Sequence, residues 1–264
     1  MTHSPEFLAD DPWLDQLLSR LPNTAIAVFG DLCLDAYWQV ETEGEETSIE
    51  TGLPTRRISR QRYAPGGAGN VAANLKALGV FDVTLIGLVG TDLFGTELKR
   101  QLEDRGLATT AVLPAPAGWQ TLVYAKPYRQ GKELNRFDFG GAMAVFPETV
   151  SEVMVALEDA ARHCAVVVIN QQIAGGWTDH FVQELNALIA RNPQTRFLLD
   201  SRDYAERVVG AALKLNHTEA VKLLQTLEPD SELDRTDAVQ VAATLAQRVG
   251  QPVFVTRGEA GMAL

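Results

Sequence analysis

Short apolar runs alternate along this chain with longer segments in which apolar residues recur at helical spacing. The runs predict strands at residues 25–29, 83–89, 165–170, 196–200, 212–216 and 253–256. The periodic segments predict helices at residues 13–21, 68–78, 93–105, 150–162, 178–191, 219–224 and 236–249. Strands that alternate with helices indicate a doubly wound α/β fold, with a mostly parallel sheet covered by helices on both faces.

Polar or glycine residues stand at or just past the ends of the predicted strands. They are Asp31, Asp35, Gly90, Asn170, Asp200, Asn216 and Thr256. Ligands of such sheets bind beyond the carboxyl ends of the strands. We therefore predict a binding site along this edge.

Residues 64–79 join a glycine-rich turn to a predicted helix. Gly66, Gly67 and Gly69 let the backbone approach a ligand closely, and Asn70 adds an amide that donates and accepts hydrogen bonds. The helix that follows offers free N–H groups and the positive end of its dipole. This combination suits a polyhydroxylated or anionic small molecule, and the alternative is a tight turn that merely starts a helix.

Composition and charge narrow the class of protein. Hydrophobic residues make up 46% of the 264 residues, which supports a sizeable core, and the net charge of −11 disfavours a nucleic-acid surface. Cys33 and Cys164 show neither a disulfide framework nor metal-ligand spacing. No run reaches the roughly 20 apolar residues of a membrane span, and residues 1–12 lack the pattern of a secretory signal. We therefore expect a cytoplasmic protein without a membrane partner.

Five motifs occur in an informative order. They are G-D-x-x-x-D at residues 30–35, G-G-x-x-N at 66–70, L-I-G-x-V-G-x-D-x-x-G at 85–95, N-x-x-E at 216–219 and T-x-G-x-x-G at 256–261. This order resembles that of the ribokinase-like (PfkB) family of sugar and nucleoside kinases, over roughly residues 24–264. Within the family, the segments 31–38, 47–50, 135–139 and 255–262 look most like the heptose 7-phosphate kinase branch.

The resemblance implies one ribokinase-like domain over residues 1–264. Two extended segments, at about 37–63 and 119–139, interrupt the alternation of strands and helices. In the family such insertions form a small β lid over the sugar, and an exposed apolar lid face often makes a homodimer interface. The alternative is a pair of ordinary surface hairpins.

The implied activity is transfer of the γ-phosphate of ATP, with Mg²⁺, to a hydroxyl of a sugar or sugar phosphate. The branch resemblance points to the anomeric hydroxyl of heptose 7-phosphate. A kinase of another sugar or of a nucleoside is the alternative within the family.

Several residues match the sugar side of the family site. Asp35 matches the carboxylate that holds sugar hydroxyls, whereas Asp31 either helps it or satisfies backbone donors at the strand end. Arg136 matches a basic residue that faces the distal phosphate of the substrate, unless it is a solvated lid arginine. The remaining matches are Gly66, Gly67 and Asn70 in the sugar floor, and Arg56, Arg57, Arg60 and Arg62 are further candidate phosphate partners.

Four residues match the nucleotide side. Asn216 and Glu219 match the pair that organises Mg²⁺ near the phosphates, which suits a cation that takes few carboxylates and many waters. The alternative is a helix that starts with Asn and an acidic first turn. Thr256 and Gly258 match the turn that contacts the nucleotide.

Two departures from the family bear on activity. No G-A-G-D motif, which carries the catalytic base and the anion hole, occurs in the sequence, so we assign no base. The apolar strand that begins at Met262 has no evident partner, so we expect either a piece of a longer kinase or a shortened relative. Residues 170–176 carry amides and small residues where heptose-type kinases carry D-Y-x-K-G. A sugar-binding relative without catalysis is therefore the rival hypothesis.

Overall fold

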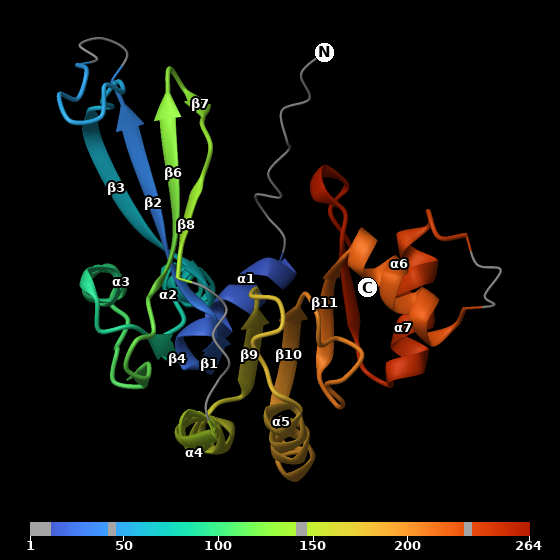
Figure 1. Cartoon of the computed structure of the whole chain (residues 1–264). Helices are drawn as coiled ribbons and strands as arrows, with labels where there is room; N and C mark the ends of the chain where they lie inside the picture. Colours follow the sequence, from blue (N-terminus) through green and yellow to red (C-terminus); the bar gives the residue numbers. More distant parts are fainter. Residues whose placement is uncertain (1–11, 42–45, 141–146, 230–233) are drawn as a thin grey trace.

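Eight strands form the main sheet of the computed structural model, which describes residues 12–41, 46–140, 147–229 and 234–264. The strands are β1 (Ala25–Gly30), β4 (Asp82–Val89), β5 (Val112–Pro114), β9 (Val166–Gln171), β10 (Arg196–Ser201), β11 (Ala212–Asn216), β12 (Val253–Thr256) and β13 (Met262–Ala263). Their order is β13-β12-β11-β10-β9-β1-β4-β5, and every pairing is parallel except that of β12 with β13 (Figure 1). The predicted, mostly parallel sheet is thereby confirmed.

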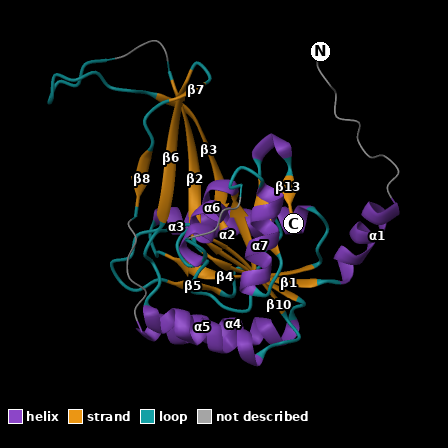
Figure 2. Ribbon diagram, turned by 90° about the vertical axis from the view of Figure 1, so that its right-hand side faces the viewer, coloured by secondary structure: helices purple, strands orange, loops and turns teal. Residues whose placement is uncertain are grey.

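Helices cover both faces of this sheet. The covering helices are α2 (Ala68–Ala77), α3 (Leu93–Glu103), α4 (Pro147–His163), α5 (Asp179–Arg191), α6 (His217–Leu227) and α7 (Ala238–Val249). Helix α1 (Pro12–Arg20) has no buried residue, and short 3-10 turns lie at Leu21–Asn23 and Gly258–Ala260. Side chains of α4 to α7 form one hydrophobic cluster with the sheet face that carries Phe29, Ile169 and Leu199. Side chains of α2 and α3 pack with the opposite face, which carries Val28 and Leu85. Figure 2 shows α4 and α5 along one side of the sheet.

A second sheet stands above one end of the first (Figure 1). Its strands are β2 (Leu32–Val40), β3 (Ile58–Gly67), β6 (Leu122–Arg129), β7 (Lys132–Glu133) and β8 (Phe137–Phe139). The order is β3-β2-β6-β7, and β8 pairs with β6. The predicted extended segments overlap these strands, with residues 42–45 outside the described part.

The position of Asp35 differs from the prediction. We expected it just past a strand, but β2 begins at Leu32, so Asp35 lies inside a strand. The physical reason is the alternation of the segment: Leu34 and Ala36 are fully buried on one face of the second sheet, which leaves Asp35 on the other face.

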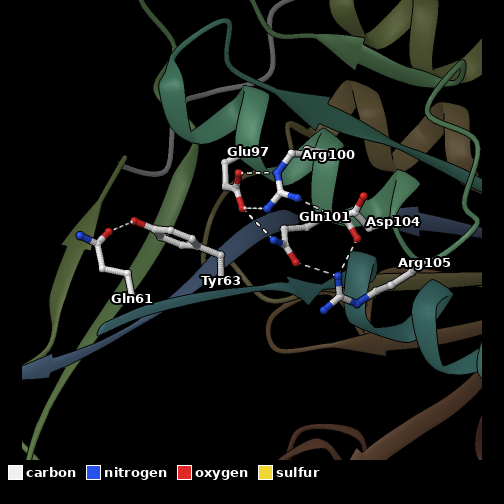
Figure 3. Close-up of polar contacts among 7 residues, drawn as sticks. All are labelled: Gln61, Tyr63, Glu97, Arg100, Gln101, Asp104 and Arg105. Carbon is white, nitrogen blue, oxygen red and sulfur yellow. Dashed lines mark hydrogen bonds and ion pairs between the residues drawn. The ribbon is translucent and has the colours of Figure 1, made fainter. Parts of the chain in front are cut away.

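The exposed face of α3 carries a ladder of polar contacts, shown in Figure 3. Arg100 donates to Glu97 at 2.7 and 2.9 Å and to Asp104 at 2.6 Å, and Arg105 donates to Gln101 at 2.8 Å. These contacts join residues three or four apart along α3 and the two residues that follow it, so each exposed pair adds only about 0.3–0.5 kcal/mol. The ladder stabilises α3 locally.

Two ends of elements also differ from the prediction. The strand at Met262 has a partner, because β13 pairs with β12 through Ala263 and Val255. Helix α6 begins at His217 and continues to Leu227, since its first turn is closed by side chains at both Asn216 and Glu219. Among the described residues, no helix combines the length and apolar character that crossing a membrane requires.

Candidate functional site

Asp31 directly follows β1 and connects three segments of the chain. One oxygen of its carboxylate accepts hydrogen bonds from the backbone N–H groups of Gln172, at 2.6 Å, and Ile173, at 2.8 Å. Its backbone carbonyl accepts from the N–H of Ala68 at 2.9 Å. Burial raises the pKa of Asp31, and the two backbone hydrogen bonds and the charge of Arg202 offset this only in part. This geometry matches the alternative in which Asp31 satisfies backbone donors at the strand end.

Asp35 forms an ion pair that the sequence did not reveal. A carboxylate oxygen lies 2.7 Å from Nζ of Lys126 on the neighbouring strand β6. Burial lowers the pKa of Lys126, but the hydrogen bond and the charge of Asp35 outweigh it, so the pKa is raised and the ammonium stays protonated. The side chains of Asp35 and Lys126 keep 21% and 20% of their surface exposed, so both remain accessible to a ligand.

Gly66 and Gly67 form the floor beside these carboxylates. A Cβ at Gly66 would lie 2.6 Å from Sγ of Cys33 and 3.3 Å from an oxygen of Asp35. Gly67 has φ of 55°, and a Cβ there would lie 2.3 Å from the carbonyl oxygen of Asp31. Side chains are therefore excluded at both positions, which keeps the space next to Asp35 free.

Cys33 lies in the same floor but is not a nucleophile. Burial, together with the charges of Asp35 and Asp31, raises the pKa of its thiol to about 12. The reactive form of cysteine is the thiolate. Cys33 therefore acts as a small buried side chain under Gly66.

Asn70 and Arg136 extend the sugar-side group. Asn70 is exposed in the first turn of α2, three residues after Gly67. Arg136 lies with its guanidinium carbon 4.6 Å from the ring centre of Tyr124, which pairs with Asp35 across β2 and β6. The guanidinium also donates to both oxygens of Asp138, at 2.6 and 2.7 Å.

The nucleotide-side residues form a separate group. Asn216 and Thr256 are paired across β11 and β12, and Gly258, with φ of 58°, follows at the start of the next turn. The Asn216 side chain accepts from the N–H of Glu219 at 2.9 Å, and the Glu219 side chain accepts from the N–H of Asn216 at 2.8 Å. The N-x-x-E motif is thus a capping box, which satisfies two backbone donors of α6.

Glu219 can hold a metal ion only as part of a mixed set of ligands. No group of three or more His, Cys, Asp or Glu side chains is arranged for a metal within the described ranges. Glu219 borders a pocket with Arg202, Asp203, Glu206 and Lys222. Mg²⁺ is usually bound through one or two carboxylates with waters and phosphate oxygens, so the half-buried carboxylate of Glu219 in such a pocket fits this cation.

The strand order separates the sugar-side residues from the nucleotide-side residues. From β1, which ends beside Asp31, to β11, which ends at Asn216, there are three strand spacings, or about 14 Å. Between them, Asp200 accepts from Asn170 at 3.3 Å and from Lys214 at 3.1 Å. The side-chain amide oxygen of Asn170 is buried and has no hydrogen-bond partner among the described residues.

Sequence reasoning missed Lys126, Lys214 and the role of the loop after β9. The ion pair of Lys126 with Asp35 depends on the register of β2 and β6, because the two residues are 91 positions apart in the chain. Lys214 alternates with buried apolar residues in β11. This alternation is the sequence signal that could have placed Lys214 on the same face of the strand as Asn216.

Comparison with solved structures places this fold in a known class. Phosphofructokinase-2 from Escherichia coli in complex with fructose-6-phosphate superposes with a TM-score of 0.65 at 20% identity, covering 90% of this chain and 76% of the other. Arabidopsis thaliana ribokinase complexed with ribose and ATP gives a TM-score of 0.63 at 18% identity, with 90% and 73% covered. At these identities the likeness concerns the fold, which is ribokinase-like.

Sequence comparison identifies the family. The profile of the pfkB family carbohydrate kinases matches residues 23–264, and the chain therefore belongs to this family. The D-beta-D-heptose 7-phosphate kinase of Bordetella bronchiseptica is 29% identical over 249 residues, covering 93% of this chain and 74% of the relative. The bifunctional protein HldE of Hydrogenovibrio crunogenus is 29% identical over 245 residues, covering 91% of this chain and 48% of the relative. The chain thus spans about half the length of the bifunctional relatives that it matches.

Proposed function

We propose that the protein transfers the γ-phosphate of ATP to a hydroxyl of a phosphorylated sugar, most closely the anomeric hydroxyl of a heptose 7-phosphate. The observation that carries this proposal is the accessible carboxylate of Asp35, which lies on the second sheet above the glycine floor. Asn216 and Thr256 stand at the carboxyl ends of two strands of the main sheet. Membership of the pfkB family and the heptose 7-phosphate kinase among the relatives support the same reaction and favour it over sugar binding without catalysis.

Each group of residues then has a task in the reaction. Asp35, oriented by Lys126, binds two hydroxyls of the sugar, because the two oxygens of one carboxylate can accept from a diol. Gly66, Gly67 and Asn70 form the floor, and Asp31 holds the loop after β9 against it. Arg136 is the cation that the motif match assigns to the phosphate of the substrate.

The nucleotide lies on the other side of the gap in this proposal. Thr256 and Gly258 contact the nucleotide, and Asn216 and Glu219 face its phosphates. Mg²⁺ bound near Glu219 would neutralise charge on the transferred phosphoryl group. Lys214, paired with Asp200, lies between the two groups of residues. No residue of the described ranges is assigned as the base.

The second sheet serves as the lid and as a dimer interface in this proposal. Apolar side chains on it remain exposed, namely Ile58, Leu134, Phe137 and Phe139. Exposed apolar surface of this kind marks an interaction site. We expect a cytoplasmic homodimer, and light scattering on the purified protein would contradict this if the mass were that of one chain at micromolar concentration.

A panel of substrates tests the reaction. The protein expressed from its full reading frame is assayed for ADP release with heptose 7-phosphate, hexose phosphates, ribose and nucleosides. We expect the highest kcat/KM with heptose 7-phosphate. Turnover with fructose phosphates or ribose alone would remove the heptose assignment, and no turnover with any sugar would remove the kinase proposal.

A further inference from the structure

Two cations lie against the ring of Tyr37 on the site face of the second sheet. Tyr37 is in the central strand β2, where it pairs with Arg62 of β3 and with Lys126 of β6. The guanidinium carbon of Arg62 lies 4.0 Å from the centre of the ring, and Nζ of Lys126 lies 5.1 Å from it. Residues that pair directly across strands point to the same face, so all three side chains share the face of Asp35.

The charges on this face are balanced unequally. Lys126 is paired with Asp35, and Arg136 is paired with both oxygens of Asp138. Arg62, in contrast, has no acidic partner among the residues that the structure describes. The ring of Tyr37 holds its guanidinium without neutralising it, so its hydrogen-bond donors remain available to an anion.

The spacing along β2 gives the distance to that anion. Side chains two residues apart on a strand are separated by about 6.6 Å. Tyr37, with Arg62 beside it, is therefore one such step beyond Asp35, away from the main sheet. A sugar ring that binds Asp35 through its hydroxyls spans about this length before its terminal substituent.

A hollow lies at this level of the second sheet. It is lined by Tyr37, Trp38, Gln39, Arg60, Arg62 and Tyr128. Two of its six lining residues are arginines and none is acidic. A phosphate group fits this environment, because a guanidinium binds phosphate with two parallel hydrogen bonds.

We propose that Arg62, stacked on Tyr37, binds the terminal phosphate of the sugar substrate and gives the site its preference for a phosphorylated sugar. The assignment rests on the proposed kinase function and replaces Arg136 by Arg62 as the phosphate-binding residue. Arg136 then has a local role, in which it fixes β8 through Asp138 next to Tyr124.

Binding measurements test this assignment without requiring turnover. The dissociation constants of a sugar phosphate and of its unphosphorylated counterpart are measured by calorimetry for the wild-type protein, Arg62→Gln, Arg62→Lys and Arg136→Gln. Arg62→Gln should lower the affinity for the sugar phosphate by about 10- to 100-fold, the range for hydrogen bonds to charged groups. The affinity for the unphosphorylated sugar should stay nearly unchanged. Arg62→Lys should recover part of the loss, since it keeps the charge without the two parallel donors.

One control and one further variant separate the alternatives. Arg100→Gln on α3 removes an exposed arginine remote from this face and should leave both affinities unchanged. Tyr37→Leu should lower the affinity for the sugar phosphate, because it releases Arg62 from its fixed position. A melting curve verifies that this variant is folded. Because added salt screens exposed charges, the preference for the sugar phosphate should also shrink as ionic strength rises.

The outcomes distinguish the two proposals. Three outcomes would overturn the role of Arg62. In the first, Arg62→Gln lowers the affinity for both sugars equally, and in the second only Arg136→Gln lowers the affinity for the sugar phosphate. In the third, the wild-type protein binds both sugars equally. The kinase proposal fails separately, when the full-length protein binds the sugar phosphate with the expected dependence on Arg62 but releases no ADP.

Discussion

Lys126 donates a 2.7 Å hydrogen bond to Asp35 from the neighbouring strand of the second sheet, across 91 positions of sequence. The pair fixes the orientation of the carboxylate that we assign to the sugar hydroxyls. It also means that the charge of Asp35 is balanced before the substrate arrives. The preference for an anionic substrate then depends on cations outside this pair, such as Arg62.

Replacing Lys126 should weaken sugar binding through Asp35. Lys126→Met keeps most of the aliphatic stem but removes the ammonium, so Asp35 loses its orientation. We expect the affinity for the unphosphorylated sugar to fall about tenfold. The free energy of unfolding should fall by about 1–2 kcal/mol, because the half-buried carboxylate of Asp35 loses its partner. Calorimetry and urea unfolding measure the two effects. Lys132→Met, on exposed β7, is the control, and unchanged affinity in Lys126→Met would contradict the prediction.

Gly67→Ala should destabilise the glycine floor strongly. The new Cβ would meet the Asp31 carbonyl oxygen at 2.3 Å, and the backbone has φ of 55° and ψ of −134°. We expect a loss of about 3 kcal/mol in the free energy of unfolding. Gly118→Ala is a matched control, since Gly118 also has a positive φ but no atom within 4 Å of the added Cβ. It should cost about 1 kcal/mol, and equal losses in the two variants would show that the close approach to Asp31 is relieved.

Asp31→Asn tests the sign of the burial effect on Asp31. Burial raises the pKa of this carboxyl above 3.8, so the folded protein binds a proton more tightly than the unfolded chain. The stability contributed by Asp31 therefore falls as the pH rises from 3.8 through the folded pKa, and it recovers as the pH is lowered. Asparagine can still accept from the N–H groups of Gln172 and Ile173 but does not titrate.

The measurement is urea unfolding of both proteins from about pH 7 to about pH 4. Relative to Asp31→Asn, the wild-type protein should gain stability as the pH falls. The difference cancels the other carboxyls, among them Asp92 and Glu97, whose pKa values are lowered in the folded state. A wild-type protein that loses stability relative to the variant on acidification would show that hydrogen bonding, not burial, dominates at Asp31.

The main sheet was predictable because its strands are short apolar runs. The runs at 25–29, 83–89 and 253–256 are bounded by polar, glycine or proline residues, and they differ from the strands by at most one residue at either end. Their assignment as strands of a parallel sheet follows from their apolar composition and from the helices predicted between them. The ribokinase-like class followed from the order of the motifs and did not require knowledge of pairing.

The contacts within the site could not be predicted in the same way. The ion pair of Asp35 depends on the parallel register of β2 and β6, and one residue of shift would turn Lys126 to the opposite face. The anchoring of Asp31 depends on backbone N–H groups at Gln172 and Ile173, which carry no side-chain signal. The assignments of Asn70, Thr256 and Gly258 to ligands remain predictions, and for the phosphate of the substrate we propose Arg62 in place of Arg136.

Glu219 is the residue where structural and catalytic roles most need separating. Its carboxylate accepts from the N–H of Asn216 in the capping box, and it is also our candidate ligand of Mg²⁺. Glutamine at this position of a capping box serves the helix as glutamate does. It lacks the negative charge through which a carboxylate ligand attracts a magnesium ion.

Glu219→Gln should therefore keep the stability of the wild-type protein within about 0.5 kcal/mol and lower the Mg²⁺-dependent rate by about 10- to 100-fold. Glu219→Ala should lose about 1 kcal/mol as well, because the side chain that closes the box is gone. Urea unfolding and ADP release at several Mg²⁺ concentrations separate the two effects. If Glu219→Gln retained full activity with an unchanged Mg²⁺ requirement, the carboxylate would serve only to cap α6, and the metal ligand would have to be sought elsewhere along the sheet edge.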